Sequence, residues 1–321
     1  MKRTYAALTA CVGAMLAMAA LDPSPSLAAS YPEKPIKVIV PHGAGGSTDI
    51  TTRLVAEPFA QNLGQSVAVV NVKGGGTAIG AQEAARSAPD GYTLAATHVA
   101  LLTSSAMGAN KMGPSSLRPI AQVGFETQLI AVQSSSAMNS LEDFYAAVKR
   151  GTAPKQKLGI NAGAANHFAF LRIMQPIDWD VLFVPTGGGG PSLKALLGGS
   201  IDVGTFVVSE VIDQIRAGNI KALAVFGPNR HPDLPDVPTA RESGYEIDVG
   251  LHYVWYAPKD TPDERIVVLA DAMEKTIADT VFQKTMLERS IEPAFMRGPG
   301  LVTVLDERYE TIKTLAKEVV K

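Results

Sequence analysis

Two glycine-rich turns, each placed between an apolar run and a helix-like segment, constrain the fold of this chain most strongly. The first follows the apolar run 36–40 and reads Gly43-Ala44-Gly45-Gly46-Ser47-Thr48-Asp49. The second follows the run 182–185 and reads Thr186-Gly187-Gly188-Gly189. Glycine lets a guest approach the backbone closely, and the free amides at a helix N-terminus attract carboxylates and phosphates. We therefore expect the two turns to hold one small anion; tight turns without a ligand are the alternative.

The N-terminal segment predicts export. Lys2 and Arg3 precede an apolar stretch at 6–20, and small residues then lead to Ala28. This pattern is typical of a secretory signal peptide, so we expect residues 1–28 to be cleaved and the mature protein to be periplasmic. The single cysteine, Cys11, lies in a segment that formally resembles a lipoprotein-processing site. Because the apolar run continues well past it, we favour ordinary cleavage.

Charge and motifs exclude several classes of function. A net charge of −2 gives no electrostatic basis for binding nucleic acid. The histidines form no i, i+4 pair and no His-Glu-x-x-His motif, so we predict no metal site and no cofactor. They are His42, His98, His167, His231 and His252. No Gly-Lys-Ser/Thr motif follows the first turn, which argues against nucleotide binding. The absence of a Gly-x-Ser-x-Gly motif at a strand end argues against a hydrolase.

The rest of the chain alternates between predicted strands and helices. The strands are 36–40, 67–70, 92–96, 158–160, 181–184, 201–208 and 221–226, and the main helices are 49–63, 141–149, 193–197, 210–216 and one that starts at 262. This alternation predicts an α/β fold with mostly parallel sheets, in which ligands bind beyond the carboxyl ends of the strands. A chain of 321 residues has room for two domains.

Apolar spacing predicts which helix faces are buried. Helix 49–63 is expected to bury Ile50, Leu54, Val55, Phe59 and Leu63, and the helix from 262 to bury Ile266, Ala270, Met273, Ile277 and Val281.

Individual polar and aromatic residues allow two interpretations each. Asp49 either caps its helix or faces the ligand through water. Thr97 and His98 follow a predicted strand, so they lie either at the edge of the cleft or on a surface loop. Asp202 is expected to order the turn at 198–199. The two tryptophans, at 179 and 255, are expected to pack in the core.

Six motifs occur in an order that resembles one known family. They are Tyr31–Ile36, Gly45–Asp49 with Arg53, Leu63–Gln65, Pro89–Leu94, Leu234–Thr239 and Ala257–Pro262. Together with the leader, they resemble the Bug-type solute receptors, the extracytoplasmic components of tripartite tricarboxylate transporters. The resemblance covers essentially the whole mature chain.

The resemblance implies a hinged, two-domain fold of the periplasmic-binding-protein type. The chain would cross twice between the domains, with residues 29–124 and 228–321 in the first domain and 125–227 in the second. Such receptors bind small organic acids, often di- or tricarboxylates, in the interdomain cleft and deliver them to a membrane permease. They do no chemistry, and we expect a monomer.

The resemblance also implies site residues. The two glycine turns, Ala44–Asp49 and Thr186–Gly189, would supply backbone amides. The segment 161–167 resembles a family turn that ends in histidine, which would bring Asn161 and His167 to the cleft. This chain has Thr186-Gly187-Gly188 where many members have Tyr-Lys-Gly, and Ala44 where many have proline, so the identity of the ligand stays open.

Two rival functions stay open beside the receptor hypothesis. A secreted α/β enzyme acting on a carboxylated substrate would need a nucleophile or a paired acid and base at the cleft. The turns supply glycines, small hydroxyls and one aspartate instead, which favours a receptor. An orphan receptor that signals through a membrane sensor kinase would look the same in sequence.

Overall fold

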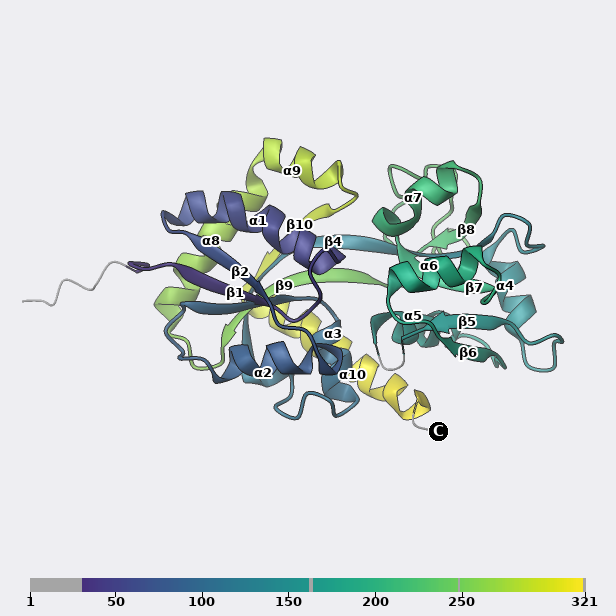
Figure 1. Ribbon diagram of the computed structural model, residues 1–321, viewed down its shortest axis with the longest axis horizontal. Helices are drawn as coiled ribbons and strands as arrows, with labels where there is room; N and C mark the ends of the chain where they lie inside the picture. Colours follow the sequence, from purple (N-terminus) through teal and green to yellow (C-terminus); the bar gives the residue numbers. More distant parts are fainter. Residues whose placement is uncertain (1–30, 162–163, 248, 320–321) are drawn as a thin grey trace, which may run out of the picture.

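A computed structural model describes residues 31–161, 164–247 and 249–319; the predicted signal peptide lies outside the described residues. Helices and strands alternate over most of the chain (Figure 1). The strands are β1 Ile36–Val40, β2 Val67–Asn71, β3 Thr93–Thr97, β4 Leu117–Gln133, β5 Lys157–Ile160, β6 Leu182–Pro185, β7 Val203–Val207, β8 Ile220–Val225, β9 Gly250–Pro258 and β10 Glu292–Arg297. The α-helices are α1 Ser47–Leu63, α2 Ala78–Arg86, α3 Ala100–Ala106, α4 Leu141–Val148, α5 Ala165–Met174, α6 Gly189–Leu197, α7 Val208–Arg216, α8 Asp263–Ala278, α9 Thr280–Leu287 and α10 Gly298–Val319.

The molecule has two lobes joined by long strands (Figure 1). In the first lobe β2, β1 and β3 are parallel, and β9, β4 and β10 extend the sheet in antiparallel fashion. In the second lobe β6, β5 and β7 are parallel, and β4 and β8 complete the sheet. The predicted α/β fold is therefore confirmed, with a parallel part in each lobe and antiparallel strands where the lobes join.

Strand β4 carries the chain from one lobe to the other. Its first part, from Leu117 to Thr127, pairs with β9, and its second part, from Gln128 to Gln133, pairs with both β7 and β8. The chain returns between β8 and β9, and Gly250 at the start of β9 lies opposite Thr127. Two crossings in adjacent strands leave a narrow connection, which is the geometry of a hinge.

Each lobe has its own hydrophobic core. In the first, Phe59 of α1 packs edge-to-face on Trp255 of β9, with ring centroids 5.3 Å apart, and both side chains are fully buried. The second core contains Phe144, Phe170 and Phe226. A smaller cluster joins the lobes, because residues of α10 pack on residues of both α3 and α5.

Three expectations about single residues are wrong. Val281 is 74 % exposed, because α8 ends at Ala278 and the side chain of Asp279 accepts the Phe282 amide to start α9. Ile50 is 42 % exposed, because α1 buries the face that carries Thr48, Thr52 and Val55. The Asp202 carboxylate accepts the Lys157 amide at 2.7 Å, so it anchors the start of β5 and not the turn at 198–199.

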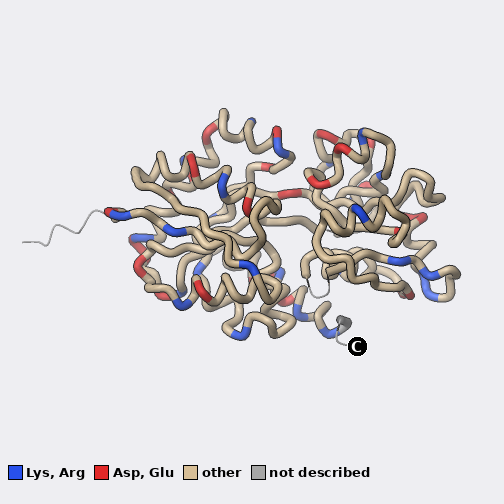
Figure 2. The backbone as a smooth tube through the Cα atoms, viewed as in Figure 1, with Lys and Arg blue, Asp and Glu red and all other residues tan. Residues whose placement is uncertain are grey.

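The packing role predicted for the two tryptophans is confirmed. Trp255 is 1 % exposed, and Trp179 is half-buried with its ring 5.7 Å from that of Phe183. Within residues 31–161, 164–247 and 249–319, no helix is long and apolar enough to cross a membrane. In this view, charged residues of both signs are interspersed over both lobes (Figure 2).

Candidate functional site

The first glycine turn joins the carboxyl end of β1 to the N-terminus of α1. Gly46 is the N-cap residue, and no side chain caps the helix there. The first amides of an α-helix lack partners within the helix, and those of α1 belong to residues that line a cleft. Gly45 has φ of +77°, a conformation that side chains with a Cβ rarely adopt.

Asp49 orders this turn from behind. Its carboxylate accepts the Gly45 amide, Arg53 Nε and Asn71 Nδ2, each at 2.9 Å, and Asp49 is 4 % exposed. Burial alone would raise its pKa, but the hydrogen bonds from Arg53, Gly45 and Asn71 outweigh burial and hold the pKa below its usual value. Asp49 is therefore an ionised brace of the turn; the N-cap position itself belongs to Gly46.

Two histidines stand beside the turn as a stacked pair. The rings of His42 and His98 are 4.7 Å apart, and His42 Nε2 lies 3.1 Å from Thr97 Oγ1. His98 Nδ1 accepts the Ala100 amide, which places a proton acceptor at that atom. Burial lowers the pKa of His42 to about 4, and burial with the charge of His42 lowers that of His98. Both rings are therefore neutral near pH 7.

The second glycine turn lies between β6 and α6. Gly188 is the N-cap of α6, again without a side-chain cap. Behind it, Thr186 Oγ1 lies 2.6 Å from Ser192 Oγ. Asn166, whose Oδ1 accepts the Asn161 amide at 3.0 Å, lies beside this turn at the start of α5.

Both turns face one cleft of about 480 Å³. Its lining comes from β1–α1, β3–α3, β5–α5, β6–α6 and β7–α7, so it contains the carboxyl ends of parallel strands from both lobes, as the α/β fold predicts. Ligand sites of small molecules usually have volumes in this range. Eight residues of the predicted site line the cleft: Ala44, Gly46, Ser47, Thr48, His98, Asn161, Gly188 and Gly189.

The other six predicted residues lie outside this lining. Gly45, Asp49 and Thr97 hold the first turn and His42 from behind. Thr186 and Gly187 do the same for the second turn. His167 is buried against Phe183, with ring centroids 4.7 Å apart, and burial lowers its pKa. These six residues therefore support the residues that line the cleft and do not line it themselves.

An acidic side chain that sequence reasoning missed also lines the cleft. Glu210 lies in the first turn of α7, and a side chain on Gly189 would collide with its carboxyl group. The carboxyl group therefore lies directly against the second glycine turn. Burial raises the pKa of Glu210, partly offset by a hydrogen bond from the Val207 backbone. An acid in the first turn of a helix is the one signal in the sequence, and it is shared by many structural glutamates.

Glu126 lies behind Glu210 on β4. It is 2 % exposed, and Ser209 Oγ donates to its Oε2 at 3.3 Å. Burial, with the charge of Glu210, raises the pKa of Glu126 to about 8. Glu126 is therefore mostly protonated at neutral pH.

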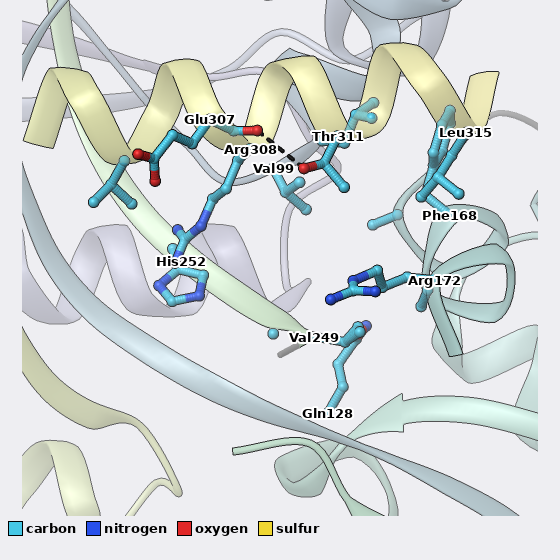
Figure 3. Close-up of a pocket in the computed structure, with 15 residues that line it drawn as sticks. Val99, Gln128, Phe168, Arg172, Val249, His252, Glu307, Arg308, Thr311 and Leu315 are labelled. Atoms are coloured by element: carbon cyan, nitrogen blue, oxygen red, sulfur yellow. Dashed lines mark hydrogen bonds between the residues drawn. The ribbon is translucent and has the colours of Figure 1, made fainter. Parts of the chain in front are cut away.

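A second cavity, also about 480 Å³, lies between α10, α5 and the joining strands (Figure 3). It is lined by Arg172, Arg308 and His252, together with apolar residues that include Phe168 and Leu315. Arg172 is tied to Gln175 Oε1 at 2.8 Å and to the Glu246 carbonyl at 3.2 Å. Among the described residues that line this cavity, three carry rings or guanidinium groups with nitrogen atoms, whereas the cleft is lined by the two glycine turns. Among the described residues, no three His, Cys, Asp or Glu side chains are grouped to hold a metal ion.

Comparison with known proteins identifies the family. The model of the tripartite tricarboxylate transporter family receptor matches residues 51–320. The chain belongs to this receptor family. BugT of Bordetella pertussis is 33 % identical over 88 % of this chain and 86 % of its own length. A protein from the TAR-I ttuE-ttuC' intergenic region of Agrobacterium vitis is 28 % identical over 90 % of this chain and 85 % of its own.

Solved structures of similar receptors share the fold. The structure of the periplasmic binding protein BugD has a TM-score of 0.76 and 30 % identity, over 90 % of this chain and 98 % of BugD. MatC from Rhodopseudomonas palustris, solved with bound malate, has a TM-score of 0.76 and 26 % identity, over 89 % of this chain and all of that one. Both structures therefore share the α/β fold described above.

Proposed function

We propose that this protein is a periplasmic receptor that captures a small organic acid in the cleft between its lobes and delivers it to a membrane permease. The observation that carries the proposal is one cleft faced by two uncapped helix N-termini, one from each lobe. The leader pattern at 1–28 supports export, and malate in the related MatC supports an organic acid as ligand. The protein does no chemistry and works as a monomer.

The proposed domains follow the two crossings of the chain. The first comprises residues 29–124 and 228–321, and the second comprises 125–227. Closure about the joining strands brings the β6–α6 wall toward α1, and a ligand that touches both walls stabilises the closed form. The permease then recognises the closed shape.

The carboxylate of the ligand binds at the first turn of α1. Hydrogen bonds to a charged group contribute about 1.5–3 kcal/mol each, and a helix N-terminus adds roughly 0.3–1 kcal/mol. After the costs of ordering the ligand and closing the lobes, a net of about −8 kcal/mol corresponds to roughly micromolar affinity. No arginine or lysine is needed, and none is among the described residues that line the cleft.

Isothermal titration with a panel of small organic acids tests the site. Replacing Gly46 with Val should abolish binding, because a branched side chain covers the amides of α1. The fold should survive: Gly46 has φ −80° and ψ 166°, which valine adopts, and the nearest atom to an added Cβ is the Gly43 carbonyl oxygen at 3.5 Å. Arg172→Gln, in the other cavity, is the matched control and should bind normally. The reverse result would move the site to the α10 cavity.

A further inference from the structure

The second cavity, between α10 and α5, contains the positive charge that the cleft lacks. Figure 3 shows the Arg172 side chain reaching into this α10 cavity from α5 and the Arg308 side chain reaching in from α10. Glu307 also belongs to the lining, but it is exposed, and Figure 3 shows its carboxylate pointing away from Arg172. Burial and the charge of Arg308 hold the pKa of His252 well below its usual value, so this ring is neutral near pH 7. The cavity therefore suits an anion.

Arg172 and Gln128 place hydrogen-bond donors together in this cavity. Gln128 lies on β4 and is 6 % exposed, and its side chain points toward Arg172 (Figure 3). The guanidinium group of Arg172 donates to Gln175 Oε1 and to the Glu246 carbonyl, and such a group has five N–H donors in all. The fork of a guanidinium group matches the two oxygens of a carboxylate. A carboxylate is therefore the anion that fits this point best.

The far end of the cavity is apolar. Phe168 of α5 and Leu315 of α10 are buried there, in the cluster that joins the lobes. Leu315 lies seven residues beyond Arg308 on α10, which is about 10 Å along a helix, and Figure 3 shows the two at opposite ends of the cavity. A second carboxylate at the apolar end would lose its water without gaining a partner. A ligand with one charged end and an apolar body fits instead.

We propose that the α10 cavity is a second binding site, for an amphipathic monocarboxylate of the medium-chain fatty acid type. The carboxylate binds Arg172 beside Gln128, and the chain extends along Phe168 toward the apolar end. The cavity volume of about 480 Å³ lies in the range of small-molecule sites. This site is independent of the receptor function proposed for the cleft, although Gln128 lines both spaces.

Three eight-carbon probes test the site by isothermal titration: octanoate, 1-octanol and octylamine. They share one chain and differ in the charge of the head group. The wild type should bind octanoate at least tenfold more tightly than 1-octanol and should bind octylamine no better than 1-octanol. Arg172→Gln should weaken octanoate binding at least tenfold and remove its preference over 1-octanol. Arg150→Gln is the matched control, because Arg150 is an exposed arginine of the same lobe, paired with Asp178, and it should bind as the wild type does.

Two further variants separate loss of the site from loss of the fold and from binding in the cleft. Thr311→Trp fills the cavity from an exposed position on α10 and should also weaken octanoate binding at least tenfold. Gly46→Val, which blocks the cleft, should bind octanoate normally.

Three results would overturn the inference: no octanoate binding by the wild type, unchanged binding in Arg172→Gln and Thr311→Trp, or loss of binding in Gly46→Val. The last would place octanoate in the cleft and leave the proposed receptor function intact. That function fails on a separate result, which is absence of binding by every di- and tricarboxylate of the panel, whatever octanoate does.

Discussion

The buried carboxyl group of Glu126 should make the stability of this protein depend on pH. Its pKa is about 8 in the folded protein, against an ordinary value of 4.5, because burial and the nearby Glu210 disfavour the charged form. Below pH 4.5 the group is protonated in both the folded and the unfolded chain. Between pH 4.5 and 8 the unfolded chain releases its proton while the folded chain keeps it, so the free energy of unfolding falls as the pH rises.

The size of this effect follows from the two pKa values. Each pH unit between them corresponds to 1.36 kcal/mol, which gives roughly 5 kcal/mol between pH 4.5 and 8 at full effect. Glu126→Gln keeps the shape and the neutral state of the side chain at every pH. The variant should therefore match the wild type near pH 5 and be several kcal/mol more stable near pH 8.

Urea denaturation at pH 5, 6.5 and 8 measures this difference. Glu57→Gln is the matched control, because Glu57 is exposed on α1, and its curve should run parallel to that of the wild type. If Glu126→Gln also runs parallel to the wild type across this range, Glu126 is ionised in the fold and the argument from its burial is refuted.

Two further variants test the brace and the core. Asp49→Asn should lower the free energy of unfolding by about 2 kcal/mol at pH 7, because the hydrogen bonds to a charged group are weakened. It should also weaken ligand binding at least tenfold, because the Gly45 turn loosens. The wild type loses this stabilisation as the pH falls through the lowered pKa of Asp49, whereas the variant does not. Urea denaturation and titration measure both effects, and unchanged binding would contradict the brace. Phe59→Ala should cost about 3–5 kcal/mol and change the fluorescence of Trp255, on which Phe59 packs; a cost under 1 kcal/mol would contradict the packing.

The local signals in the sequence predicted the units that build the cleft. The apolar runs before both glycine turns are β1 and β6, and helices follow both turns, as expected. The predicted helix 141–149 is α4, and Ser140 caps it by accepting the Asp143 amide. These features depend on residues close together in the chain, which is why they can be read from it.

The strand that joins the lobes was not predicted. β4 spans Leu117–Gln133 and contains Pro119, Gly124 and polar residues that interrupt any simple alternation. Its stability comes from strands that lie far away in the sequence, such as β9, in which Tyr256 lies opposite Pro119. Long-range pairing of this kind leaves no local pattern in the sequence.

The positions of the acidic side chains at the site could not be predicted from local sequence either. Glu210 and Asp49 are both acids in the first turn of a helix. The carboxylate of Asp49 accepts hydrogen bonds within its own turn, including one from the Gly45 amide. The carboxyl group of Glu210, which belongs to α7, lies against Gly189 of α6. Which acid reaches the cleft therefore depends on the contacts that each one makes with other parts of the fold.

The central claim is that backbone amides of the first turn of α1 and of the second glycine turn bind opposite ends of one ligand. An amide chemical-shift titration by NMR, with a ligand found by calorimetry, tests it most directly. The signals of Ser47, Thr48, Gly188 and Gly189 should shift with one common midpoint, while that of Thr311 in the α10 cavity stays unchanged. Shifts confined to one turn, or shifts of Thr311 without those of Ser47, would contradict the account.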